Sequence, residues 1–190
     1  MIDVVFLQGA GAGAHAADAE LAASLDRELG DGFRVDFPVM PDEDNPEYEP
    51  FRPVIADAIA RADRPVVVGH SLGGYFLLKY LAEERPDVDI RAICLIAAPF
   101  PNGDPDWTFD DFELPDGFGD LLPAGIPILL FASEDDDIVP FAHRDLYAAA
   151  IPRAVTHTTT GGHQLGDDLG VVARELLAAL EPSSRQPSTQ

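Results

Sequence analysis

Short apolar runs rich in β-branched residues alternate along this chain with alanine- and leucine-rich stretches of helical period. This alternation restricts the fold more than any other feature, because parallel strands must be joined by crossovers, which are usually helices. It predicts an α/β fold, a three-layer open sheet of about six mainly parallel strands with helices on both faces. We expect strands at residues 3–8, 32–37, 65–69, 90–97, 126–132 and 154–158, and helices at residues 15–29, 47–62, 72–84, 141–150 and 167–180.

A single domain over residues 1–180 is expected, since no internal repeat and no second periodic region interrupts the pattern. Two irregular stretches, 38–50 and 99–123, stand between the expected elements. The final residues, 181–190, are polar and punctuated by proline, which predicts a disordered tail.

The charge of the chain excludes several kinds of partner. Its 34 acidic and 12 basic residues give a net charge of −22, so a nucleic-acid backbone would be repelled. No apolar run approaches the roughly 18 residues of a membrane-spanning helix, and we expect no membrane association. An acidic surface with a single lysine is typical of proteins from salt-loaded cytoplasms, and the ordinary acidic surface of a mesophile stays open as the alternative.

The chain is expected to be a cytoplasmic protein, either a monomer or a small homo-oligomer. Its first apolar run contains Asp3 and has no basic residues before it, which favours a first strand over a signal peptide. Cys94 is the only cysteine and predicts no internal disulfide.

The strongest local motif is Gly-His-Ser-Leu-Gly-Gly at residues 69–74, directly after a run of three valines and at the start of a helical stretch. In this strand–turn–helix context, Gly-x-Ser-x-Gly places a serine on a strained turn with its hydroxyl above the sheet. The amides at the start of the helix point at negative charge that develops beside Ser71. The alternative is a purely structural role, in which Ser71 only caps the helix.

A serine nucleophile needs a histidine base, and that base needs an acid to fix its tautomer. Asp136 follows the fifth expected strand and His163 follows the sixth, and sites in open parallel sheets form at these carboxyl ends. The neighbouring Asp135 and Asp137 stay open as alternatives to Asp136. His143 and His157 are interpreted as ordinary surface or strand residues.

The order Ser71, Asp136, His163 over almost the whole chain resembles the α/β hydrolases, and most closely the small serine hydrolases of the retinoblastoma-binding protein 9 type. The resemblance implies a compact fold without a separate cap domain. It also implies that the acid stands three residues before the valine of a Val-Pro pair, which selects Asp136, and that the base follows a glycine after the last strand, which selects His163.

Acyl transfer also needs two hydrogen-bond donors for the oxyanion. The hydrolase arrangement takes one from the residue after the nucleophile and one from the loop after the first strand. These are the amides of Leu72 and Ala10, with Gly11 as the competitor of Ala10. Gln8 stands where a histidine usually precedes the glycine in the family, a departure that bears on the choice of donor.

Residues 99–123 follow the fourth expected strand, beside the turn that carries Ser71, and contain several aromatic side chains. We predict a shallow aromatic lip over Ser71, with closure of the core edge as the alternative use of these rings. The residues expected to contact substrate are Trp107, Phe109, Phe112 and His70, and His70 is also expected to pack or orient the turn. The predicted activity is that of a serine hydrolase (carboxylesterase-like) acting on small neutral or cationic carboxyl esters, with thioesters or amides as further substrates.

Two rival interpretations remain at this point. Gly9-x-Gly11-x-x-Ala14 after a strand satisfies a relaxed dinucleotide-binding fingerprint, with Asp36 near the place of a ribose-binding acid. A non-catalytic binding protein with a hydrolase fold is the second. We expect no cofactor and no metal, because the single cysteine lies in an apolar run and no two histidines share ligand spacing.

Overall fold

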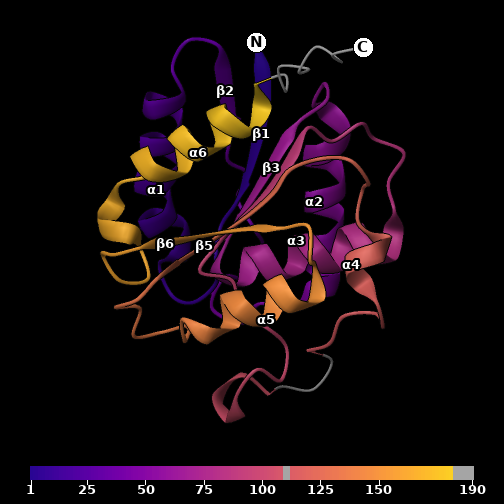
Figure 1. Ribbon diagram of the computed structural model, residues 1–190, viewed down its shortest axis with the longest axis vertical. Helices are drawn as coiled ribbons and strands as arrows, with labels where there is room; N and C mark the ends of the chain where they lie inside the picture. Colours follow the sequence, from indigo (N-terminus) through magenta and orange to yellow (C-terminus); the bar gives the residue numbers. More distant parts are fainter. Residues whose placement is uncertain (109–111, 182–190) are drawn as a thin grey trace, which may run out of the picture.

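The computed structural model describes residues 1–108 and 112–181 and contains one six-stranded sheet (Figure 1). The expected fold class is confirmed. Its strands are β1 (Ile2–Leu7), β2 (Phe33–Asp36), β3 (Val66–His70), β4 (Ala92–Ile96), β5 (Ile128–Ser133) and β6 (Val155–Thr159). The helices are α1 (Ala14–Leu29), α2 (Tyr48–Arg61), α3 (Ser71–Glu84), α4 (Phe118–Leu121), α5 (Ala142–Ala150) and α6 (Gly170–Leu180).

Every strand pair in the sheet is parallel, and the order across the sheet is β2-β1-β3-β4-β5-β6. The chain first moves outward from β1 to β2 and then returns past β1 to β3. This reversal is the topological switch point, and the crevice outside the carboxyl ends of β1 and β3 is where open α/β sheets bind ligands. Ser71 and the loop after β1 lie at this point of the fold.

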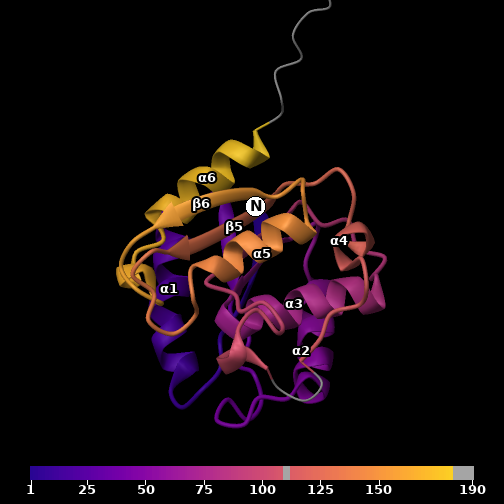
Figure 2. The same cartoon turned by 60° about the horizontal axis from the view of Figure 1, so that its bottom comes forward.

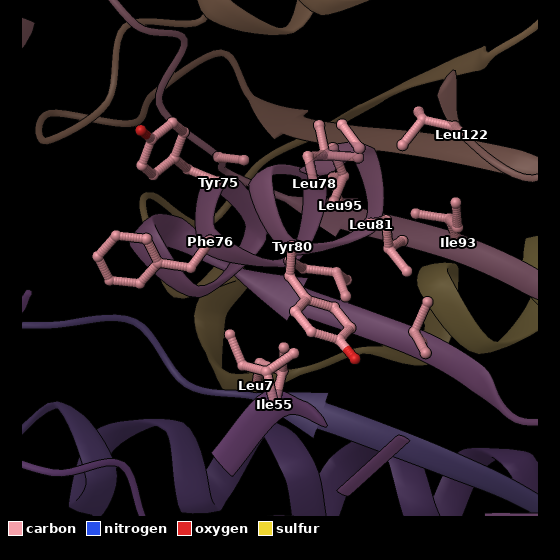
Figure 3. Close-up of a cluster of buried hydrophobic side chains, with 14 of the residues drawn as sticks. Leu7, Ile55, Tyr75, Phe76, Leu78, Tyr80, Leu81, Ile93, Leu95 and Leu122 are labelled. Carbon is pink, nitrogen blue, oxygen red and sulfur yellow. The ribbon is translucent and has the colours of Figure 1, made fainter. Parts of the chain in front are cut away.

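The central strands are buried on both faces and alternate between two apolar clusters. Val5 and Leu7 of β1 pack with α2, α3 and α5, whereas Val4 and Phe6 pack with α1 and α6. Figure 3 shows part of the first cluster, where Leu78 and Leu81 of α3 lie near Ile93 and Leu95 of β4. Alternation across a sheet covered on both sides explains why these strands appear as continuous apolar runs.

Helices α1 and α6, from opposite ends of the chain, lie side by side on one face of the sheet, and α2, α3 and α5 cover the other (Figures 1 and 2). One hydrogen bond between them is donated by the Leu169 amide to Ser24 Oγ at 3.0 Å. The start of the last helix is therefore fixed against the first helix of the chain.

The structure differs from expectation mainly in its short elements. Two 3₁₀ turns, Pro105–Trp107 and Leu165–Asp167, and the single-turn helix α4 fall where the sequence predicted irregular chain or the start of a longer helix. Gly166 and Asp167 both have positive φ, which a right-handed helix does not contain, so the predicted helix at 167–180 begins later, at Gly170. Residues 182–190 of the predicted tail lie outside the described residues. None of the described helices is long and apolar enough to cross a membrane.

Candidate active site

Ser71 is the first residue of α3 and follows directly on β3. Its backbone has φ of +49°, a left-handed conformation that is uncommon for a residue with a side chain and that is found at functional turns. The surrounding contacts require small residues. A Cβ on Gly69 would stand 2.5 Å from the Cα of Gly74, and one on Gly73 would overlap the carbonyl oxygen of Gln8. The glycines thus let the turn close tightly against the end of β1.

Asp136 and His163 are brought together from the loops after β5 and β6. Nδ1 of His163 lies 2.9 Å from Oδ2 of Asp136, so the carboxylate fixes Nδ1 as the protonated nitrogen. Within the described part of the chain, no hydrogen bond engages Nε2 of His163. That nitrogen is the one available to exchange a proton with another group.

The second oxygen of Asp136 is held by the chain itself. Oδ1 accepts hydrogen bonds from the amides of Ile138 and Val139, both at 2.9 Å. Burial of Asp136 raises the pKa of its carboxyl, but the bond and charge of His163 and these two amides outweigh it, and the pKa lies below its usual value. Asp136 is therefore ionised at neutral pH.

The neighbours of Asp136 have other roles. Asp135 accepts hydrogen bonds from the amides of Gly161 and Gly162, at 3.0 and 3.1 Å from Oδ1, and so holds the loop that carries His163. Asp137 is exposed. Of the three consecutive aspartates, Asp136 is the partner of the histidine.

Ser71, Leu72 and His163 line one cavity of about 1160 Å³. Trp107 and Phe112 lie in its wall, and Phe109 falls outside the described residues. A cavity of this volume is not the shallow lip that the sequence predicted, because α2 and α3 extend the wall with Tyr48, Tyr75, Phe76 and Lys79. No direct hydrogen bond joins the hydroxyl of Ser71 to His163 in the described residues. Such bonds are often long without substrate.

The loop after β1, residues 9–13, forms another wall of the cavity and is here called the glycine loop. The amide of Gly9 donates to Oδ2 of Asp18 at 2.7 Å, and the amide of Gly11 donates to the carbonyl oxygen of Glu43 at 2.7 Å. Gly11 is therefore ruled out as an oxyanion donor. No hydrogen bond engages the amide of Ala10 within the described residues.

The carboxylate of Glu43 occupies the N-terminal end of α1. It accepts hydrogen bonds from the amides of Gly13 at 3.0 Å and His15 at 2.7 Å, and from the side chain of Gln8 at 3.2 Å. These amides are where a dinucleotide pyrophosphate would bind if the glycine loop were a nucleotide fingerprint. The chain fills that position with its own carboxylate, which opposes the dinucleotide interpretation. No group of three or more metal-ligating side chains lies together in the described residues.

Two histidines differ from their sequence interpretation. His70 lines the cavity, but its ring bonds to Asp18 at 2.9 Å and to the carbonyl oxygen of His163 at 3.0 Å, so neither nitrogen faces a substrate. His143 is buried rather than at the surface. Its Nδ1 accepts the amide of Phe100 at 2.8 Å, and its Nε2 donates to Asp104 at 2.6 Å.

Comparison with known proteins identifies the family and the fold. The sequence profile described as the alpha/beta hydrolase family matches residues 4–183. Among solved structures, the chain is similar to the esterase domain of a Rhodothermus marinus protein, with 21% identity over 93% of this chain and 84% of that chain and a TM-score of 0.68. It is also similar to the ydeN gene product from B. subtilis, with 20% identity over 96% of this chain and 100% of that chain and a TM-score of 0.70.

A third similar structure is an esterase from Exiguobacterium antarcticum, with 16% identity over 96% of this chain and 92% of that chain and a TM-score of 0.66. At these identities the likeness establishes the fold alone. A comparison with curated proteins found no match. Because the family profile matches nearly the whole chain, from within β1 to beyond the end of α6, the chain belongs to the alpha/beta hydrolase family.

Proposed function

We propose that the chain is a serine hydrolase that cleaves carboxyl esters through an acyl-enzyme on Ser71. One observation carries this proposal: His163 is held at Nδ1 by an ionised Asp136, its Nε2 is unengaged within the described residues, and it lines the same cavity as Ser71. An imidazole in this state can take a proton from a hydroxyl, which is the activation that a serine nucleophile needs.

In the proposed reaction, Oγ of Ser71 attacks the ester carbonyl carbon while Nε2 of His163 takes its proton. The amides of Leu72 and Ala10 receive the oxyanion. His163 then returns the proton to the departing alcohol, and a water molecule activated by the same nitrogen hydrolyses the acyl-enzyme. Asp136 keeps the imidazole in the required tautomer and stabilises its charged form throughout.

The walls of the cavity favour neutral or cationic esters. Glu47, Glu49 and Glu83 stand along it, and the one lysine, Lys79, has its ammonium 2.8 Å from Glu83 and 3.1 Å from the carbonyl oxygen of Glu113. An anionic substrate would meet an excess of negative charge. The aromatic wall offers apolar contact, and the cavity volume allows acyl groups larger than acetyl. Thioesters and amides follow as secondary substrates of the same chemistry.

Within the family, we place the chain with the small serine hydrolases of the retinoblastoma-binding protein 9 type. The support is the Val139–Pro140 pair three residues after Asp136, together with the absence of a cap domain from the described residues. This placement proposes a single domain over residues 1–180 that works in the cytoplasm.

A fluorophosphonate probe tests the proposal, because it reacts with an activated serine and leaves a stable adduct. The wild-type protein should be labelled at Ser71, and Ser71→Ala should abolish the label. Ser133→Ala is the matched control, since this buried serine at the end of β5 bonds to Thr159 and should not affect labelling. An unlabelled wild type at both low and molar salt would instead favour a binding protein with a hydrolase fold.

A second arm of the same experiment tests the substrate class. With p-nitrophenyl butyrate and the p-nitrophenyl half-ester of succinate, kcat/KM should be about tenfold lower for the anionic ester at low salt. The gap should narrow in molar salt, where the Debye length falls to about 3 Å. A preference for the anionic ester would contradict the assigned charge selectivity.

A further inference from the structure

A second Asp–His pair lies directly behind the proposed nucleophile. Asp18 of α1 and His70 at the end of β3 are each 1% exposed, and Oδ2 of Asp18 lies 2.9 Å from Nδ1 of His70. His70 immediately precedes Ser71, and its ring centroid is 4.8 Å from that of His163. The pair is buried and close to the reacting groups, but the mechanism above assigns it no step.

Asp18 joins three loops that are far apart in the sequence. Its Oδ2 also accepts the amide of Gly9 at 2.7 Å, and its Oδ1 accepts the side-chain amide of Gln164 at 3.2 Å. Gly9 precedes the proposed oxyanion donor Ala10, and Gln164 follows the proposed base His163. One carboxylate thus contacts the glycine loop, the nucleophile turn and the histidine loop.

The ring of His70 completes the link to the base. Its Nε2 lies 3.0 Å from the backbone carbonyl oxygen of His163. A carbonyl oxygen can only accept, so Nε2 must carry a hydrogen. Nδ1 faces a carboxylate oxygen that already accepts the Gly9 amide, so this nitrogen donates as well. The geometry is satisfied when His70 is an imidazolium paired with an ionised Asp18.

The charge state of Asp18 agrees with this arrangement. Burial raises the pKa of the Asp18 carboxyl, but the hydrogen bond and charge of His70 and the amides of Gly9 and Gln164 bring it below its usual value. The titratable groups that face His70 are Asp18 from α1 and His163 from the loop after β6, with Asp136 behind His163. The negative charge in direct contact with the ring is therefore that of Asp18.

A buried ion pair is a poor device for stability alone, because desolvation of two charges offsets most of their attraction. An apolar pair of the same volume would fill the space equally well. What it could not do is accept the Gly9 amide, accept the Gln164 side chain and donate to the His163 carbonyl. The contacts of this pair, rather than its burial, account for its place in the fold.

We propose that Asp18 and His70, as a carboxylate–imidazolium pair, are positioning residues that hold the glycine loop and the loop of His163 in place relative to Ser71. The proposal rests on the proposed serine hydrolase function. Neither side chain touches the reacting atoms. Their effect is on the distances between Ser71, the Ala10 amide and the His163 ring, and an error of about 1 Å in such distances can lower a rate about a hundredfold.

Kinetics of isosteric variants provide the test. Asp18→Asn and His70→Gln should each lower kcat for p-nitrophenyl butyrate about 10- to 100-fold, with KM within about threefold of wild type, and the double variant should be no worse than the worse single one. Asp26→Asn is the control, since it removes an equal charge from the same helix, and among the described residues the side chain of Asp26 accepts only the amide of Val35. Urea unfolding verifies that each variant is folded under assay conditions.

The protonation of His70 gives a readout that does not depend on turnover. In ¹⁵N spectra of the wild type at pH 7, assigned with His70→Gln, both ring nitrogens of His70 should carry protons. A His70 ring with one bare nitrogen, or folded single variants with kcat within threefold of wild type, would overturn the positioning role. If fluorophosphonate fails to label the wild type, the hydrolase function falls, and this role falls with it.

Discussion

His163 and His143 have the same immediate partner and opposite surroundings. Each ring lies within hydrogen-bond distance of an aspartate, Asp136 in one case and Asp104 in the other. His143 has its second nitrogen bonded to the amide of Phe100, under the loop after β4. His163 has its second nitrogen unengaged within the described residues and lines the cavity. An aspartate partner alone therefore does not mark a histidine as a base, and the role proposed for His163 rests on its unengaged second nitrogen and its place in the cavity wall.

The largest effect is expected from breaking the Asp136–His163 pair, which faces the cavity. His163→Ala removes the proposed proton acceptor, and kcat/KM for p-nitrophenyl butyrate should fall at least about a thousandfold. Because the buried ring also bonds to the carboxylate of Asp136, stability should fall as well, and urea unfolding verifies that the variant is folded in the assay. Stopped assays with long incubation measure the residual rate. Retention of more than a tenth of wild-type activity would show that another group takes the proton from Ser71.

The same substitution at the other histidine should lower stability but leave the rate largely unchanged. His143→Ala removes a buried ring and leaves the amide of Phe100 without its partner, so the free energy of unfolding should fall by about 1–3 kcal/mol. kcat should stay within about tenfold of wild type. Urea unfolding followed by circular dichroism gives the stability, and the ester assay gives the rate. A thousandfold loss of kcat in a folded variant would remove the distinction between the two pairs.

The smallest expected effect is on the stability of the fold at acidic pH. The pKa of Asp136 and that of Asp104 both lie below the usual 3.8. Burial raises each pKa, but the hydrogen bonds from the paired histidine and from backbone amides lower it by more. The folded state thus binds fewer protons than the unfolded state near pH 4. The stability from each carboxylate is complete above pH 3.8 and is lost as the pH falls through its folded value.

Asp136→Asn and Asp104→Asn should therefore both flatten the fall in stability on acidification. The advantage of wild type over either variant should shrink between pH 6 and pH 3, as measured by urea midpoints at a series of pH values. A residual slope should remain in both, because Asp18 and Glu43 also have lowered pKa values. A constant difference over this range would mean that neither carboxylate is linked to folding in this way.

The sequence was most informative where a local pattern and a strand end coincide. The run of valines before Ser71 predicted the nucleophile turn. Asp136 and His163 were candidates because each follows a strand of a parallel sheet, and the family resemblance selected Asp136 from its two neighbours. The structure adds that these last two side chains meet. The roles assigned to all three stay predictions until the variants are measured.

Other features depend on contacts that no local pattern shows. Glu43 reaches the glycine loop only because of the path taken by the irregular stretch after β2, and the burial of His143 depends on how the loop after β4 folds over α5. Asp18 did leave a signal. It stands three and seven positions before Leu21 and Leu25, on the apolar stripe of its helix, and an acid on a buried stripe needs partners.

The bond between Gln164 and Asp18 spans 146 positions, nearly the length of the chain. A segment that has emerged from the ribosome without β6 and α6 lacks both His163 and the bond that links α1 to the loop of His163. Contacts so distant in sequence form late, since closing a long loop has an entropic cost that only a largely assembled sheet offsets. The activity proposed for Ser71 therefore depends on the synthesis and docking of the last loop and helix of the fold.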